Sequence, residues 1–112
     1  MKTVIITGGT KGLGKAIAKA FALHNYNLIL TYLHDDASAL QTKKELEQFN
    51  SEVMIVKSDV SDEQEVIKLL DNVKSRFESI DVLINNAGIA IDTTLEDKTV
   101  DNFKRILDTN LI

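Results

Sequence analysis

Glycine residues gather near the amino terminus, where the run Gly8-Gly9-Thr10-Lys11-Gly12-Leu13-Gly14 follows a short apolar segment. Gly8 can take the positive φ of a sharp turn, Gly12 leaves room for an anion to approach the backbone, and Gly14 lets a following helix pack closely. The unpaired N–H groups in the first turn of that helix would point at the anion. The order of strand, glycine turn and helix therefore predicts a binding site for a nucleotide phosphate.

The spacing of these glycines, G-x-x-x-G-x-G after Thr7, separates several kinds of nucleotide-binding turn. The common dinucleotide fingerprint G-x-G-x-x-G fails, because Ile17 stands where its last glycine belongs. A P-loop fits from Gly9 to Lys15, but Ala16 stands where a Ser or Thr hydroxyl should reach Mg²⁺. A glycine-rich turn without any ligand is the structural alternative.

Polar residues follow the third and fourth apolar runs of the chain. After the third run comes Asp59-Val60, where the carboxylate could accept a hydrogen bond from an adenine amino group while Val60 covers the ring. The alternative is that Asp59 caps the next helix. After the fourth run comes Asn85-Asn86-Ala87-Gly88, whose small residues either let a ligand lie flat against the backbone or form a simple turn. Because ligands bind at the carboxyl ends of parallel strands, we expect both segments beside the glycine turn.

Alternating strands and helices must position these segments. The predicted strands, 3–7, 27–32, 52–57 and 80–85, are nearly continuous apolar runs, which is typical of a parallel sheet covered on both faces. The predicted helices are about 13–24, 36–49 and 61–77, with a last one from about 99, and Ser61 and Gln64 are expected to form a capping box. Right-handed crossovers then predict an α/β fold: a Rossmann-like sheet of strand order 3-2-1-4, an incomplete doubly wound domain.

Composition indicates one ordinary globular domain of 112 residues, 44% hydrophobic and 27% charged, with a net charge of −4. The absence of cysteine excludes disulfides and cysteine nucleophiles. Basic and acidic residues are mixed, and no apolar run reaches membrane-spanning length, so we expect no nucleic-acid or membrane partner. A strand at residue 3 leaves no room for a signal peptide, which predicts a cytoplasmic protein. His24 and His34 are expected at a helix end and in a loop, without metal-ligand spacing.

The glycine turn, Asp59-Val60 and the Asn85–Gly88 segment stand in the order and at the strand ends of classical short-chain dehydrogenase/reductases. This resemblance covers the whole chain, and the segment 80–89 with Asp92 is most similar to the 3-oxoacyl-(acyl-carrier-protein) reductase branch. It implies that residues 1–112 form the NAD(P)-binding half of a carbonyl reductase, truncated before the catalytic Tyr and Lys. The implied cofactor contacts are Gly8, Thr10, Lys11, Gly12, Leu13, Gly14, Tyr32, Asp59, Val60, Asn86, Ala87 and Gly88.

Cofactor choice depends on the end of the second predicted strand. An NAD enzyme needs a carboxylate there for the ribose 2′-OH, but Tyr32 occupies the position. Asp35 and Asp36 come later, where we expect them to cap the second helix. In the family, a basic residue at the position of Lys11 favours NADP, although Lys11 could also be a solvated loop residue. We therefore expect NADP(H).

The family's catalytic Tyr-x-x-x-Lys is missing, because Leu30 and Asp36 stand four residues after Tyr26 and Tyr32. The resemblance gives Asn110 a catalytic role, in which it holds a water that links the lysine to a proton relay; the alternative is a structural amide on the buried stripe of its helix. We expect the 112-residue chain alone to be inactive, and a catalytically inactive nucleotide-binding module is the rival hypothesis.

The resemblance also implies properties of the complete enzyme. It is expected to be a homo-oligomer of fatty acid biosynthesis that acts on a small-molecule carbonyl, including one carried on acyl carrier protein.

Overall fold

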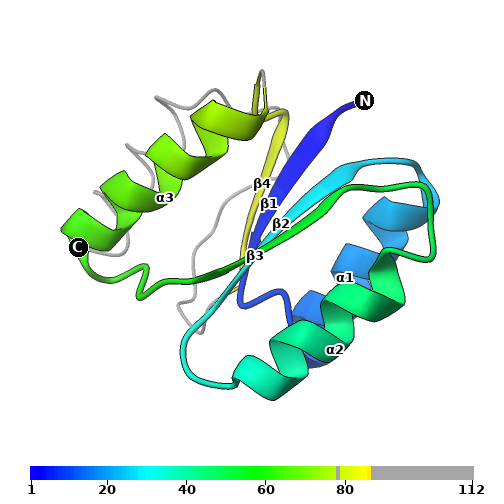
Figure 1. The fold of residues 1–112 in the computed structure, drawn as a ribbon, viewed down its shortest axis with the longest axis horizontal. Helices are drawn as coiled ribbons and strands as arrows, with labels where there is room; N and C mark the ends of the chain where they lie inside the picture. Colours follow the sequence, from blue (N-terminus) through cyan, green and yellow to red (C-terminus); the bar gives the residue numbers. More distant parts are fainter. Residues whose placement is uncertain (78, 87–112) are drawn as a thin grey trace.

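The computed structural model describes residues 1–77 and 79–86. The predicted helix from residue 99 and the predicted site residues Ala87, Gly88 and Asn110 lie outside the described residues. Strands and helices alternate along the described chain (Figure 1). Their bounds are β1 Thr3–Thr7, α1 Gly12–Leu23, β2 Asn27–Tyr32, α2 Asp36–Leu46, β3 Val53–Lys57, α3 Glu63–Arg76 and β4 Val82–Asn85. None of these helices is long and apolar enough to cross a membrane.

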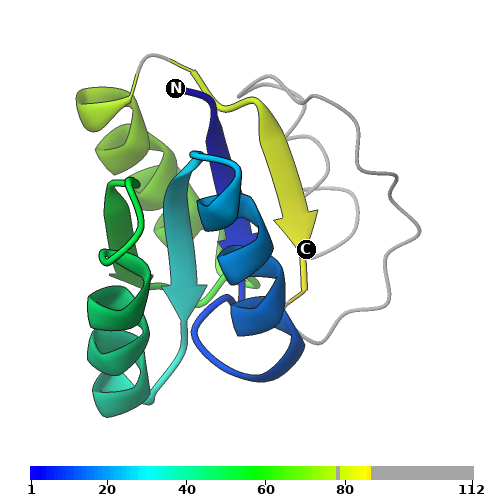
Figure 2. The same ribbon diagram turned by 90° about the vertical axis from the view of Figure 1, so that its right-hand side faces the viewer.

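The four strands of the described chain form one parallel sheet in the order β3-β2-β1-β4, which confirms the predicted order. In its register, Ile5 of β1 lies beside Ile29 of β2 and beside Leu83 of β4. Helices α1 and α2 cover one face of the sheet and α3 covers the other (Figures 1 and 2). The carboxyl ends of all four strands therefore lie at the same edge of the sheet, where the predicted site segments begin.

Successive strand residues face opposite sides of the sheet and build two apolar layers. On the side of α3, Ile5 and Ile29 pack with Val66 and Leu69, all of them fully or almost fully buried. The layer toward α1 and α2 contains Val4, Ile6, Leu28, Leu30, Ala18 and Leu46. Each large apolar side chain so buried stabilises the fold by roughly 1.5–3 kcal/mol, which explains why the strands are continuous apolar runs.

Helix α3 is capped by a different residue from the one predicted. The carboxylate of Asp62 accepts a hydrogen bond from the backbone N–H of Gln64 at 2.9 Å, so Asp62 is the N-cap and the capping box of Ser61 with Gln64 is wrong. Ser61 instead donates both its N–H and its hydroxyl to Asp59. Asp59 thus accepts the hydrogen bonds of Ser61, and Asp62 accepts that of Gln64. Helix α3 begins at Glu63 as a result. The other predicted bounds differ from those observed by at most three residues.

Candidate functional site

The glycine turn between β1 and α1 has backbone features that only glycine readily supplies. Gly8 and Gly12 have φ values of 64° and 56°, in the left-handed region. A Cβ on Gly14 would lie 2.0 Å from the carbonyl oxygen of Gly8, so no larger residue fits where α1 meets the turn. A Cβ on Gly12 would meet nothing within 4 Å. The backbone at Gly12 is therefore open to an incoming group.

Hydrogen bonds to β2 and β4 hold this turn in place. The backbone N–H of Asn86 donates to Oγ1 of Thr7 at 2.8 Å, and its side-chain Nδ2 donates to the carbonyl oxygen of Gly8 at 3.3 Å. On the opposite side, the N–H of Gly8 donates to Oγ1 of Thr31 at 3.2 Å. The turn is fixed between two strand ends, so its backbone is already positioned for a ligand.

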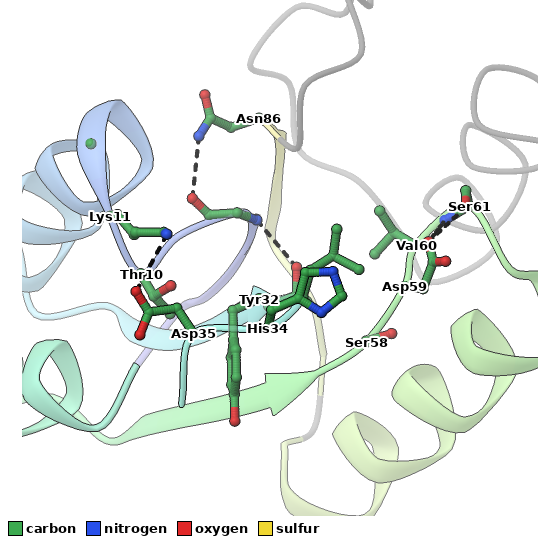
Figure 3. Close-up of a pocket in the computed structure, with 14 residues that line it drawn as sticks. Thr10, Lys11, Tyr32, His34, Asp35, Ser58, Asp59, Val60, Ser61 and Asn86 are labelled. Atoms are coloured by element: carbon green, nitrogen blue, oxygen red, sulfur yellow. Dashed lines mark hydrogen bonds and ion pairs between the residues drawn. The ribbon is translucent and has the colours of Figure 1, made fainter. Parts of the chain in front are cut away.

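A cavity of about 600 Å³ lies in front of the turn, at the carboxyl ends of the strands. Lys11 and Asp35 lie on one side of it and Asp59 and Val60 on the other, with His34 between them (Figure 3). Of the predicted site residues, the structure brings together at this cavity Gly8, Thr10, Lys11, Gly12, Tyr32, Asp59, Val60 and Asn86.

Two of the described site predictions do not line the cavity. Gly14 packs against Gly8 and Asn86 instead, and the Leu13 side chain is 69% exposed. Six further residues line the cavity without a ligand role predicted from the sequence, namely Thr31, Leu33, His34, Asp35, Ser58 and Ser61. All six lie at the end of β2, just after it, or just after β3. This position at the carboxyl ends of strands is the signal that could have identified them.

Lys11 and Asp35 form an ion pair at the edge of the cavity. The Nζ of Lys11 lies 3.4 Å from Oδ2 of Asp35, and the two side chains are 65% and 40% exposed. Asp35 is the N-cap of α2, as predicted, and accepts hydrogen bonds from the backbone N–H and the hydroxyl of Ser38 at 3.0 and 2.8 Å. These bonds from Ser38, with a smaller contribution from Lys11, hold the pKa of the Asp35 carboxyl below its usual value.

Tyr32 ends β2 with a phenol in place of a carboxylate. Its hydroxyl donates to Oδ1 of Asp36 at 2.9 Å, and this hydrogen bond is the main reason that the pKa of Tyr32 is raised. Asp36 also pairs with Lys57 at 3.5 Å. Asp36 is the first residue of α2 rather than its cap, so the expectation that both aspartates cap this helix is correct only for Asp35.

Asp59 shapes the turn before α3 but does not cap that helix, whose N-cap is Asp62, so the alternative role as a helix cap is wrong. Its Oδ1 accepts from the backbone N–H of Ser61 at 3.0 Å and from the Ser61 hydroxyl at 2.6 Å, and these bonds lower the pKa of Asp59. Among the described residues, Oδ2 of Asp59 accepts no hydrogen bond. One carboxylate oxygen thus shapes the turn after β3, while the other is available at the cavity wall.

Ser58 carries a buried hydroxyl that has no hydrogen-bond partner in the described chain. The residue is 5% exposed and lines the cavity, and its backbone N–H donates to the carbonyl of Tyr32 at 2.9 Å. Leaving a buried hydroxyl without a partner costs roughly 1–3 kcal/mol. A polar ligand atom or a water in the cavity would remove this cost, so the site fits a molecule with hydrogen-bonding groups.

The groups that converge on the cavity suit an anionic nucleotide. The turn supplies backbone N–H donors at the amino terminus of α1, and Lys11, Ser58 and Asn86 add a cation, a hydroxyl and an amide. A parallel sheet with such a turn at the end of its first strand defines the Rossmann-like class of nucleotide-binding proteins.

Comparison with known proteins identifies the family within this class. A family model described as short chain dehydrogenase matches residues 2–112. The chain belongs to the short-chain dehydrogenase family.

Curated relatives of the chain differ in the substrates that their names give. It is 34% identical over 110 residues to 3beta-hydroxysteroid dehydrogenase 1 of Eggerthella lenta, covering 98% of this chain and 42% of the relative. Glucose 1-dehydrogenase 2 of Bacillus subtilis and a 3-oxoacyl-(acyl-carrier-protein) reductase of Staphylococcus aureus are each 32% identical over 98% of this chain. The chain spans less than half the length of these relatives, 43% and 45% for the last two.

Solved structures of dehydrogenases and reductases are also similar to this chain in both sequence and fold. A short-chain dehydrogenase from Oenococcus oeni is 39% identical with a TM-score of 0.73, over 83% of this chain and 41% of that one. L-sorbose reductase from Gluconobacter frateurii, solved with NADPH and L-sorbose, is 33% identical with a TM-score of 0.73, over 83% of this chain and 35% of that one.

Proposed function

We propose that the natural protein containing this chain is an NADP(H)-dependent oxidoreductase that reduces a carbonyl group to a hydroxyl, with residues 1–112 as its cofactor-binding half. The observation that carries this proposal is the close contact of Gly14 with Gly8, which holds an open glycine turn at the mouth of a cavity at the strand ends. Family membership supports the same reaction class.

Each side of the cavity would hold a different part of the dinucleotide. The glycine turn and the first N–H groups of α1 suit the pyrophosphate, and Asp59 with Val60 suits the adenine. Asn86, followed by Ala87 and Gly88, suits the ribose next to the nicotinamide. When bound, the nicotinamide supplies the hydride. We assign Asn110 the task of holding a water for proton delivery.

Lys11 is the proposed partner of the 2′-phosphate. Among the described residues that line the cavity it is the one Lys or Arg, and Tyr32 leaves the end of β2 without a carboxylate to repel a phosphate. The NADPH complex of L-sorbose reductase supports this choice by similarity.

The proposed substrate is a 3-oxoacyl thioester, including one carried on acyl carrier protein. Support comes from the segment 80–89 and from the similarity to the Staphylococcus aureus reductase. A cytoplasmic homo-oligomer working in fatty acid biosynthesis is part of the same proposal.

A titration of the natural protein, with its intact mass measured first, tests this function. We expect NADPH to bind more tightly than NADH, and Lys11→Ala to lose roughly threefold in NADPH affinity. Lys15→Ala is the matched control, because Lys15 pairs with Glu45 at 2.7 Å and does not line the cavity.

An activity assay of the natural protein tests the proposed reaction. We expect a 3-oxoacyl thioester to oxidise NADPH. Binding without turnover on any carbonyl would favour the inactive nucleotide-binding module, and no binding of either cofactor would exclude both.

A further inference from the structure

The ion pair of Lys11 with Asp35 places a negative charge where the proposed function needs a positive one. The two residues come from the turns after β1 and β2, and both line the cavity. A 2′-phosphate that approached Lys11 would therefore meet the Asp35 carboxylate, 3.4 Å from the lysine ammonium. Two anions that share one exposed cation weaken each other's binding.

The two partners of this pair are not equally free to move. Asp35 is tied to Ser38 by two hydrogen bonds, so its carboxylate is held at the amino terminus of α2. A further bond, from Oγ1 of Thr42 to the carbonyl oxygen of Thr10 at 2.7 Å, ties α2 to the glycine turn. The Lys11 side chain is 65% exposed and has no other ion-pair partner in the described chain. The lysine can turn toward a ligand, but the aspartate stays.

The surrounding charges do not cancel the Asp35 carboxylate. Asp36, the next acidic residue, is already paired with Lys57 and receives the Tyr32 hydroxyl. Across the cavity, Asp59 is a second anion, and His34 lies between Asp59 and Asp35 (Figure 3). Lys11 is thus the permanent cation of the described cavity wall, and Asp35 is the anion closest to it.

We propose that Asp35 is a specificity-determining residue that limits the preference for NADP(H) by competing with the 2′-phosphate for Lys11. This inference rests on the proposed function. As a consequence, the natural protein binds NADPH only slightly more tightly than NADH and uses both cofactors. The carboxylate does not repel NADH in this way, because that cofactor carries a hydroxyl in place of the phosphate at the 2′ position.

Asp35→Ser in the natural protein tests the role of the charge. Serine is also a favoured N-cap, so α2 keeps its cap while the carboxylate is removed. Asp62→Ser is the matched control: it makes the same change at the N-cap of α3, outside the cavity lining. NADPH and NADH are titrated by fluorescence against all three proteins. We expect Asp35→Ser to tighten NADPH binding roughly two- to fivefold and to leave NADH within twofold of the parent, with a smaller gain in high salt.

The possible outcomes separate this inference from the proposed function. An unchanged ratio of NADPH to NADH affinity in Asp35→Ser, or an equal change in Asp62→Ser, would overturn the role of Asp35 while leaving cofactor binding intact. Loss of binding for both cofactors in the parent protein would instead overturn the proposed function, and this inference with it.

Discussion

Gly12 and Gly14 lie two residues apart in one turn, but the same added methyl group should affect them differently. Gly14→Ala places a Cβ 2.0 Å from the Gly8 carbonyl oxygen, so the turn must shift and we expect a loss of about 1–3 kcal/mol or more in the free energy of unfolding. Gly12→Ala meets no neighbour and should cost about 1–2 kcal/mol of backbone strain, while its methyl group narrows the approach to the backbone. Urea unfolding and NADPH titration of both variants check this. If Gly12→Ala lowers cofactor affinity no more than its loss of stability explains, the open face of Gly12 is not the phosphate site.

Single carboxylates also set the acid sensitivity of the fold. The pKa values of Asp35, Asp59 and Glu45 are lowered by hydrogen bonds, mainly from Ser38, Ser61 and Lys15 respectively. A carboxyl whose folded pKa lies below its unfolded value, about 4, stabilises the fold above that pH, and this contribution is lost as the pH falls through the folded pKa. We expect the melting temperature to fall below about pH 5, and to fall less steeply in Asp59→Asn. Parallel curves for the two proteins between about pH 5 and 2 would contradict this assignment.

At the scale of elements, the amino terminus of α3 has two adjacent residues, Ser61 and Asp62, that could each serve as the N-cap by residue type, but only Asp62 does so in the structure. Asp62 accepts from the N–H of Gln64, whereas Ser61 bonds to Asp59 outside the helix. We therefore expect Asp62→Ala to destabilise the protein by about 1 kcal/mol through loss of the cap, and Ser61→Ala to have a smaller effect on helix α3. Hydrogen exchange of the first α3 amides distinguishes the two. Faster exchange in Ser61→Ala than in Asp62→Ala would restore the predicted capping box.

The strands and helices themselves follow from local patterns. Each strand is a short apolar run because both of its faces are covered, and each helix begins where a polar residue or a glycine turn interrupts such a run. These patterns do not distinguish which of several adjacent polar residues makes the cap, because Ser and Asp both suit that position. The predicted bounds of the strands and helices therefore agree with the observed bounds within three residues, whereas the predicted N-cap of α3 is wrong.

At the scale of the whole molecule, the sheet has one central strand pair and two edges in the described chain. At one edge, β4 pairs with β1 on one side, and no described strand pairs with its other side. The strand carries the buried residues Val82, Leu83 and Ile84, which are at most 8% exposed. An unpaired apolar strand is a template for pairing with another chain. We expect residues 1–112, prepared alone, to self-associate in sedimentation experiments across a concentration series, and to do so less when a complementing carboxyl-terminal half is supplied. A monomer with a cooperative melt at high temperature would show that these residues are self-sufficient.

The sequence alone determined the α/β class, the strand order β3-β2-β1-β4 and the place of the glycine turn. Apolar runs, helical periods and the spacing of Gly8, Gly12 and Gly14 are local signals, and right-handed crossovers leave few ways to arrange them. Most of the described residues that were predicted from the sequence as cofactor contacts line one cavity, because the carboxyl ends of parallel strands lie on the same side of the sheet.

Only the tertiary structure decided which of these residues contact one another. Lys11 and Asp35 are 24 positions apart, and Gly8 and Asn86 are 78 apart, so no local pattern could predict their contacts. That the Ser58 hydroxyl has no hydrogen-bond partner among the described residues likewise becomes clear only from the folded arrangement. Such contacts depend on the relative positions of separate turns, which the packing of α1 and α2 against the sheet sets. The spacing of the glycines therefore predicts the type of site, whereas the arrangement of charges around it depends on how the loops fold together.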